Sequence, residues 1–224
     1  MSMVLGQSPD RKSPPYDAWP KTFIHAIEAA LKEAMQRIKS NKQAKELCDA
    51  DEEKMTSWLC DELILIAEEE LIAGYNYAVF QDPVLDSPTN NADQTSYKKR
   101  PDLRFRRQPH HSRLVDRPRE DAWFCECKII EEKTNSSKTY KNYWDRGVQR
   151  FVDGSYAWAM PHAQMIAYVR WASDAIGFGP KHTELKKCAQ DLDGDICITQ
   201  HSRKTDKGQV LNDIQLRHLW FKFQ

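Results

Sequence analysis

The sequence lacks any apolar run of about 18 residues, the length at which a stretch becomes a candidate membrane-spanning helix. Its first residues, MSMVLGQSPDRKSPPYDAWP, also lack the apolar segment of a secretory signal peptide. The six cysteines include no CxxC pair, which counts against a zinc site and against a disulfide framework. We therefore expect a cytoplasmic protein without membrane contact, whose cysteines are reduced.

The sequence also lacks net charge, because 33 basic residues balance 33 acidic ones, and this counts mildly against indiscriminate binding of nucleic acid. The charges are nevertheless unevenly distributed. Residues 46–93 include thirteen acidic side chains and one basic one, whereas residues 98–119 include nine basic and two acidic ones. Such neighbouring blocks fit a cation site beside a phosphate-binding surface, and they fit equally well two solvated faces that pair with each other.

The length of 224 residues and the apolar content of 40% suit one α/β domain with terminal extensions. Residues 1–16 are rich in serine, proline and charge, and they predict a flexible N-terminal arm. We expect residues 17–224 to form a single domain, with its core at about 50–171 and a C-terminal appendage at 172–224.

Apolar residues at helical spacing predict amphipathic helices at 20–40 and 52–73, separated by a polar turn, and a third helix at 139–160. Gly74 is expected to end the second helix. Strands are expected at the apolar, aromatic and β-branched runs 75–80, 103–107, 123–130, 164–171 and 217–223. Helices that alternate with strands in this order predict an α/β fold with a mixed central sheet flanked by helices.

The residues that could carry chemistry lie on two of these strands. Asp102, preceded by Pro101, opens the strand at 103–107, where a proline is tolerated because the first residue of a strand needs no amide donor. Glu126 and Lys128 lie two residues apart on the next strand and therefore project to the same face. Hydrolysis of a phosphodiester needs carboxylates that hold a divalent cation, and a nearby lysine can orient the attacking water.

An acidic residue two positions before a lysine is common in this chain and occurs at Asp10, Glu52, Glu126, Glu131 and Glu184. Only the pair of Glu126 and Lys128 lies within a strongly apolar strand downstream of a Pro-Asp dipeptide. Burying two ionisable side chains costs several kcal/mol unless they are paired or bind a metal, so this position favours a functional site. The alternative is an edge strand with one solvent-exposed face and an incidental Glu–Lys pair.

The pattern of Asp102, Glu126 and Lys128 resembles that of the PD-(D/E)xK nuclease superfamily, over roughly residues 50–171. The resemblance implies a restriction-endonuclease-like core in the order helix-strand-strand-strand-helix-strand, to which this chain adds an N-terminal helix and a C-terminal strand. It implies Mg²⁺, for which Mn²⁺ often substitutes, bound by Asp102, Glu126 and the carbonyl of Cys127. Lys128 would orient a water that attacks the phosphate in line and leaves a 5′-phosphate and a 3′-hydroxyl.

The resemblance also implies an acidic residue from the helix before the sheet. Glu52 is our candidate for this catalytic role, because it continues the apolar stripe of the helix that it begins. The alternative is a first-turn glutamate that interacts with the helix dipole. Glu53, Glu62 and Glu70 remain alternatives for the same role.

Relatives place a further polar residue on the helix after the motif, above the site. Gln149 is the first candidate for a catalytic role there and Arg150 is the second, with a simple ion pair as the alternative for Arg150. The chain departs from the subgroup pattern in which a tyrosine follows four residues after the glutamine, since Asp153 stands at that position. The role of Gln149 is therefore open.

These observations predict a Mg²⁺-dependent endonuclease. The resemblance favours double-stranded DNA over RNA as the substrate, because most of the superfamily acts on DNA. A restriction or phage-defence setting and a homodimer follow by analogy only. The alternatives are a catalytically inactive nuclease-fold module that binds nucleic acid or protein, and a hydrolase of small phosphate esters. The basic residues expected to contact the nucleic-acid backbone are Arg104, Arg106, Arg107, Arg113 and Arg150.

Overall fold

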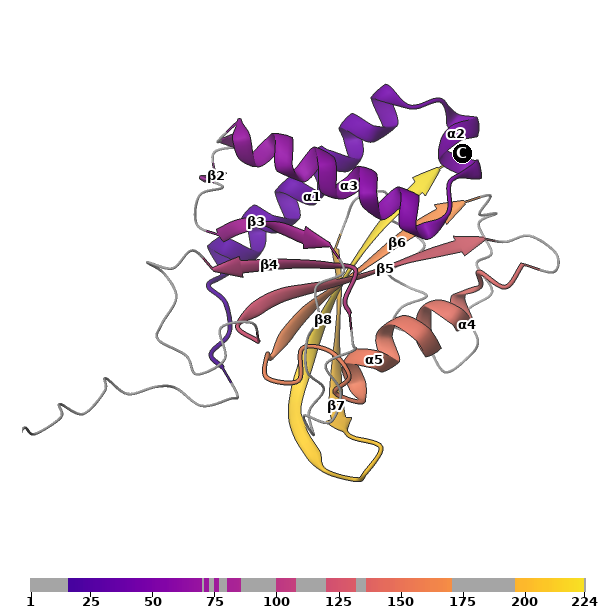
Figure 1. Cartoon of the computed structure of the whole chain (residues 1–224). Coiled ribbons are helices and arrows are strands. Elements are labelled where there is room, and N and C mark those ends of the chain that lie inside the picture. The colour runs from indigo at the N-terminus through magenta and orange to yellow at the C-terminus, as the bar shows by residue number, and fades with distance from the viewer. Residues whose placement is uncertain are drawn as a thin grey trace, which may run out of the picture.

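The structure is a computed structural model that describes residues 16–69, 71–72, 75–76, 80–85, 100–107, 120–131, 136–170 and 196–223. The backbone alone is described at 71–72, 75–76, 80–84 and 107. The chain is a mixed α/β protein in which helices cover both faces of a six-stranded sheet (Figure 1). No helix within the described ranges is long and apolar enough to cross a membrane.

Three helices precede the sheet, and they are α1 (Lys21–Asn41), α2 (Ala44–Asp49) and α3 (Glu52–Glu68). α1 confirms the amphipathic helix predicted at 20–40, and its apolar face is buried. α3 begins at the predicted residue, because the Asp51 side chain accepts a hydrogen bond from the backbone nitrogen of Lys54 over 2.8 Å. α3 ends at Glu68, before the predicted residue 73, because a short strand begins at Leu71. α2 lies where the sequence predicted only a polar turn, because so short a helix shows little periodicity.

The strands are β1 (Leu71–Ile72), β2 (Tyr75–Asn76), β3 (Phe80–Leu85), β4 (Leu103–Arg107), β5 (Ala122–Glu131), β6 (His162–Arg170), β7 (Ile196–Lys204) and β8 (Val210–Phe223). β1 and β2 form a separate two-stranded ribbon. The sheet has the order β3-β4-β5-β6-β8-β7. β5, β6 and β8 run parallel to one another, and the remaining neighbours are antiparallel. The predicted mixed sheet is thereby confirmed.

Most of the predicted strands are confirmed, and the exceptions have a local cause. β4, β5 and β6 lie at the expected positions, whereas the strand expected at 75–80 is replaced by β2 and by β3, which begins at Phe80. β7 is a strand that the sequence did not predict, because its outward-facing residues are polar or charged except Ile198, and its buried residues alternate with them.

The two faces of β5 are covered by different helices. Cys127 points to the face that α1 and α3 cover, and its thiol lies beside the hydroxyls of Thr56 and Tyr168, which are 3.4 Å apart. Glu126 and Lys128 point to the opposite face. That face is covered by α4 (Tyr140–Tyr143), the π-helical turn η2 (Trp144–Val148) and α5 (Gln149–Val152), as Figure 1 shows.

Gly147 brings η2 close to the sheet. A Cβ atom at this position would lie 2.6 Å from Cε of Met165 and 3.4 Å from Cγ of Lys128. The helix predicted to run to residue 160 ends at Val152. It ends there because the chain turns at Gly154, whose φ of 74° is the left-handed conformation that favours glycine.

The residues expected as a C-terminal appendage contribute β7 and β8 to the same sheet, and β8 lies between β6 and β7. Arg217 on β8 binds Glu28 of α1 through two hydrogen bonds of 2.5 and 3.0 Å. Tyr16, expected in the flexible arm, is buried, and its backbone nitrogen donates to the carbonyl of Ala159 over 2.8 Å. The rest of the expected arm, residues 1–15, lies outside the described residues.

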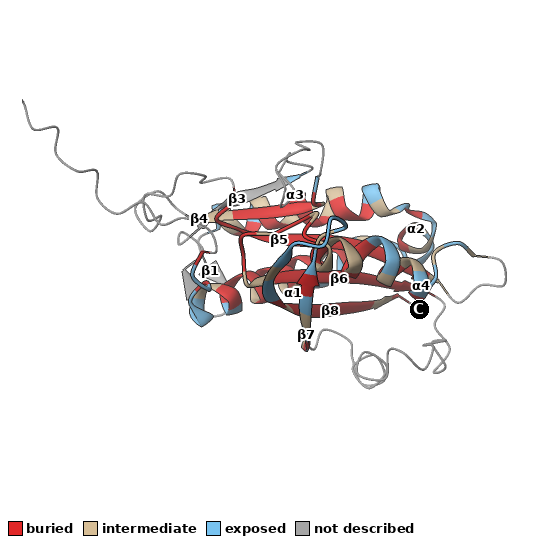
Figure 2. Cartoon of the chain, turned by 90° about the horizontal axis from the view of Figure 1, so that it is seen from below, coloured by how far each residue is buried: buried red, intermediate tan, exposed pale blue. Residues whose placement is uncertain are grey.

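The core lies between the helices and the sheet, and Figure 2 shows the inner strands β5 and β6 as almost entirely buried. β8 is buried mainly in its second half. Four cysteines are free thiols, as predicted: Cys48, Cys60, Cys125 and Cys127. The prediction of reduced cysteines is wrong for Cys197, which is disulfide-bonded.

Arg203 of β7 joins the β7–β8 pair to the segment that follows α5. Its guanidinium is buried and donates to the backbone carbonyls of Asn212, Ala157, Trp158 and Met160, over 2.5 to 3.3 Å. Burial lowers its pKa to about 10, so it remains charged at neutral pH.

We expect Arg203→Met to lower the free energy of unfolding by about 2–4 kcal/mol, because it leaves several buried carbonyls without donors. Urea unfolding measures this loss, with the exposed neighbour Lys204→Met as the control. Equal, small effects of the two substitutions would contradict the structural role given to Arg203.

Candidate active site

The candidate site forms where β4 and β5 separate. The pairing of β4 with β5 ends at Leu103, so the next N–H groups along this edge of β5 have no neighbouring strand among the described residues. Asp102 Oδ2 accepts a hydrogen bond from the backbone nitrogen of Cys127 over 2.6 Å. Glu52 Oε2 accepts one from the backbone nitrogen of Ile129 over 3.2 Å. Two carboxylates thus replace a strand as acceptors for β5, and these bonds fix their positions.

The ammonium group of Lys128 lies among these carboxylates. Its Nζ donates to Glu52 Oε1 over 2.7 Å and to the carbonyl oxygen of Cys127 over 2.6 Å. Glu126 Oε1 lies 3.0 Å from Nζ, and Asp102 Oδ2 lies 3.8 Å from it. Because an ammonium has three N–H bonds, the three shorter contacts use its whole donor capacity.

A second cation reaches the site from α5. Arg150 Nη1 donates to Glu126 Oε1 over 2.7 Å and to the hydroxyl of Tyr156 over 2.8 Å. The Tyr156 hydroxyl donates in turn to the carbonyl oxygen of Arg100 over 2.8 Å. Arg100 shortly precedes Asp102 in the chain, so these bonds connect the strand of Glu126 to the turn that carries Asp102.

Burial has the largest effect on the protonation of the carboxylates. It raises the pKa of Glu126 to about 8, with a further increase from the negative charge of Asp102, although Lys128 and Arg150 act in the opposite direction. Burial likewise raises the pKa of Asp102. Burial would lower the pKa of Lys128, but the surrounding carboxylates, Glu126 first, hold it above its ordinary value. Lys128 is therefore charged at neutral pH, and Glu126 binds a proton more readily than an exposed carboxylate does.

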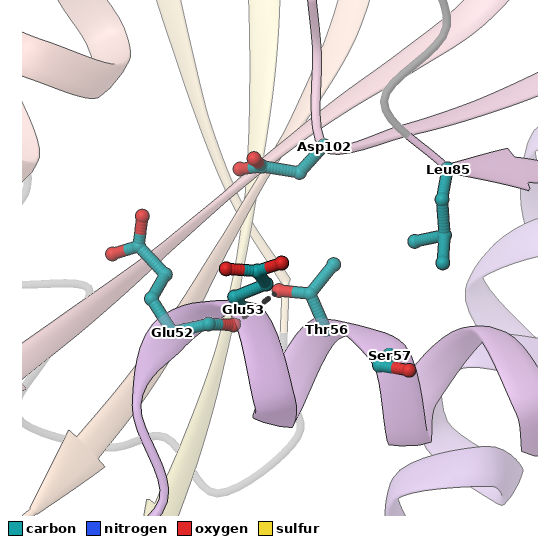
Figure 3. A pocket seen from close by; sticks show the side chains of 6 residues that line it. All are labelled: Glu52, Glu53, Thr56, Ser57, Leu85 and Asp102. Carbon is teal, nitrogen blue, oxygen red and sulfur yellow. Dashed lines mark hydrogen bonds between the residues drawn. The ribbon is translucent and has the colours of Figure 1, made fainter.

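A pocket of about 510 Å³ opens beside the carboxylates (Figure 3). The residues that line it are Glu52, Glu53, Thr56, Ser57, Leu85 and Asp102. In Figure 3 the carboxylates of Glu52 and Glu53, on the first turn of α3, lie across the pocket from Asp102. This negative wall attracts small cations, and it would admit a phosphate group only together with a cation.

The donors of the site fit a divalent cation in kind but only partly in arrangement. Carboxylate and carbonyl oxygens are the ligands that Mg²⁺ prefers. Glu126 Oε2 is buried and has no hydrogen-bond partner, so it has a lone pair to offer. Within the described ranges, however, no group of three or more acidic, histidine or cysteine side chains has the arrangement of a preformed metal site. Lys128 and Arg150 instead both contact Glu126 Oε1, an oxygen atom that a cation could use.

The structure brings four of the five predicted catalytic residues together. Asp102, Glu126 and Lys128 meet as expected, and Glu52 joins them through Lys128. Gln149 does not join them, because its side chain makes no hydrogen bond to the other four residues in the described structure. Arg150 makes the contact from this helix instead, since its side chain points to Glu126.

The basic residues predicted to bind nucleic acid differ in how far their side chains are exposed. The prediction is wrong for Arg104, which is 4% exposed and has no surface to offer a phosphate. Strand alternation puts it on the inner face together with Glu126, and the sequence does not show that helices cover this face. Arg106 is partly exposed, and the Arg150 side chain is 39% exposed. The predictions for the side chains of Arg107 and Arg113 lie outside the described residues.

Tyr156 also belongs to the site, and the sequence did not predict this. A helix continuing to residue 160 would not direct it toward Arg150. The turn at Gly154 ends the helix and returns the chain, so that the backbone nitrogen of Tyr156 donates to the carbonyl of Arg150 over 3.0 Å. The Asp-Gly-Ser segment at 153–155 is the signal that could have revealed this turn, since such residues typically end helices.

We expect Glu126→Gln to remove much of the pH dependence of stability in the chelator-treated protein. The raised pKa of Glu126 means that the stability present below pH 4.5 is lost as the pH rises through about 8, because the folded chain must then bury a charge. The wild-type protein should lose a few kcal/mol across this window in urea unfolding.

The substitution Glu53→Gln, at an exposed carboxylate of the same helix, is the control and should keep the wild-type slope. A wild-type unfolding free energy that is constant between about pH 5 and pH 8 would contradict this electrostatic description of the site.

Comparison with known proteins adds nothing to this geometry. No family model, no curated protein and no solved structure matches the chain. What the site does must therefore follow from the chemistry of its own residues.

Proposed function

We propose that the chain is a metal-dependent nuclease with a restriction-endonuclease-like core, and that it hydrolyses phosphodiester bonds in DNA. One observation carries the proposal. Asp102, which directly precedes β4, and Glu126, in the middle of the neighbouring strand β5, place carboxylate oxygens within 3.8 Å and 3.0 Å of the Lys128 ammonium. An acidic pair and a lysine gathered in this way beside an open pocket are the groups that metal-assisted phosphodiester hydrolysis needs.

The surroundings of β5 support the proposal over an incidental Glu–Lys pair on an edge strand. β5 is an inner strand with neighbours on both sides, and Glu126 is fully buried. A protein rarely buries a carboxylate without a use for it, because the cost is several kcal/mol. Apart from the two-stranded ribbon of β1 and β2, the chain order α3, β3, β4, β5, the helical segment from α4 to α5, and β6 also agrees with the order that the superfamily resemblance implies.

Each residue of the site has a role in this proposal. Asp102, Glu126 and the Cys127 carbonyl are the donors that would hold Mg²⁺, which when bound neutralises the scissile phosphate and lowers the pKa of a water. Lys128 keeps its charge at neutral pH, so it can orient the attacking water and stabilise charge that develops on the phosphate. Glu52 positions Lys128, and the partly exposed Arg150 positions Glu126.

DNA is proposed over RNA on the superfamily resemblance, and a homodimer and a role in restriction or defence rest on the same basis. The charge of the pocket adds one physical constraint. Since its wall carries Glu52, Glu53 and Asp102, a nucleic-acid phosphate is repelled until a cation is present. Binding of nucleic acid at this pocket should therefore depend on divalent cations.

We expect Mg²⁺-dependent cleavage of plasmid or single-stranded DNA, which Asp102→Asn and Lys128→Gln should each reduce about a hundredfold or more. The amide that replaces the Asp102 carboxylate can still accept from the Cys127 nitrogen, so this substitution tests chemistry more than folding. Gel analysis of cleavage, with and without chelator, makes the measurement. Matched controls are Asp61→Asn on the exposed surface of α3 and Lys138→Gln, whose lysine pairs with Glu131 outside the site.

The proposal predicts wild-type cleavage rates for both controls. If the wild-type protein leaves every DNA and RNA substrate intact in Mg²⁺ and in Mn²⁺, the proposal is wrong. Binding of nucleic acid without cleavage would then favour an inactive nuclease-fold module.

A further inference from the structure

Lys128 binds the oxygen atoms that a divalent cation would need. Its Nζ donates to the carbonyl of Cys127 over 2.6 Å and lies 3.0 Å from Glu126 Oε1, and both are donors proposed for Mg²⁺. The third proposed donor, Asp102, lies 3.8 Å from Nζ. The ammonium therefore lies among the oxygen atoms that would bind the divalent cation.

An ammonium and a divalent cation cannot share these donors without strong repulsion. Bound to the same carboxylates, they would lie within about 4 Å of each other in a site with little solvent screening. Arg150 already adds a second positive charge on Glu126 Oε1, and the Tyr156 hydroxyl holds it there. Lys128 is the cation with more freedom to leave, because its ammonium ends a flexible four-carbon stem.

The contacts of Lys128 also limit what it can do in its present position. All its N–H bonds are used by Glu52, Glu126 and the Cys127 carbonyl. In this state the ammonium has no donor left for a water molecule or a phosphate oxygen. The role given to Lys128 in hydrolysis therefore requires that it first gives up some of these contacts.

We propose that Lys128 is the resident counter-ion of the site and a direct competitor of the divalent cation. On this inference, which rests on the proposed metal-dependent function, cation binding displaces the ammonium from Glu126 and from the Cys127 carbonyl. The displaced ammonium regains free N–H donors for water or phosphate. The same lysine thus weakens cation binding in the resting protein and becomes available for chemistry only when the cation has bound.

Two substitutions of Lys128 distinguish the effect of its positive charge from the effect of its hydrogen bonds. Lys128→Gln removes the positive charge but retains an amide that can donate to Glu52 or Glu126. Lys128→Arg retains the positive charge. Lys138→Gln is the matched control, because it removes a lysine paired with Glu131 over 3.3 Å and changes the net charge of the chain equally.

The test measures Mn²⁺ binding to the full chain without nucleic acid, from the electron paramagnetic resonance signal of free Mn²⁺. We expect Lys128→Gln to bind Mn²⁺ at least about tenfold more tightly than the wild type, because a competing charge is removed. Lys128→Arg and Lys138→Gln should not tighten binding. Mn²⁺ should also raise the Tm of Lys128→Gln more than that of the wild type.

A second measurement needs no substitution and keeps the test valid if Lys128→Gln does not fold. The Lys128 ammonium should give a protected ¹⁵N signal in the wild-type protein, and Mg²⁺ should shift this signal or expose it to solvent exchange. A signal unchanged by bound Mg²⁺ overturns the inference.

The inference is also overturned if Lys128→Gln and the wild type bind Mn²⁺ equally well, or if Lys138→Gln tightens Mn²⁺ binding as much as Lys128→Gln does. Either result is compatible with DNA cleavage by the wild type. Tight Mn²⁺ binding by Lys128→Gln, with no cleavage of any nucleic acid by the wild type, would support the inference and refute the nuclease. Absence of Mn²⁺ binding by all variants refutes both.

Discussion

The ion network around the Lys128 ammonium is the interaction on which the site depends. A charged side chain within a sheet is stable only when opposite charges and acceptors surround it, and removal of one partner from such a set is costly. Here the acceptors come from three parts of the chain: Glu52 begins α3, Asp102 precedes β4, and Glu126 lies on β5. The network therefore also constrains how α3 and the entry to β4 dock against the edge of β5. A buried carboxylate with an unpaired oxygen remains at its centre.

The fold supplies what this network requires. Because β4 pairs with β5 only as far as Leu103, the N–H groups of Cys127 and Ile129 donate to the carboxylates of Asp102 and Glu52. β6 pairs with the other edge of β5, and β8 pairs in turn with β6. Arg217 with Glu28 joins α1 to β8. The bonds from Arg150 through Tyr156 to the Arg100 carbonyl connect the helical layer to the turn that carries Asp102. Packed and hydrogen-bonded surroundings of this kind favour a site whose groups must keep their mutual distances.

Much of this arrangement could be predicted from the sequence, and the failures have physical causes. The i, i+2 spacing of Glu126 and Lys128 in an apolar run, downstream of Pro101 and Asp102, was sufficient to predict that these side chains meet. The helix stripe favoured Glu52 but left Glu53, Glu62 and Glu70 as alternatives. Periodicity did not distinguish Gln149 from Arg150, because the π-helical turn η2 changes the direction of the side chains that follow it. Nor could alternation alone show that Arg104 is covered, or that β7 completes the sheet, since both depend on contacts between distant segments.

The central claim is that the carboxylates around Lys128 are a cation site from which the lysine can be displaced. The most direct measurement is anomalous X-ray scattering from crystals of the protein grown with Mn²⁺. The claim predicts a single strong peak within coordination distance of Asp102 and Glu126, with the Lys128 ammonium no longer in contact with the Cys127 carbonyl. A peak elsewhere, or an ammonium that keeps all its present contacts while Mn²⁺ is bound, would contradict it.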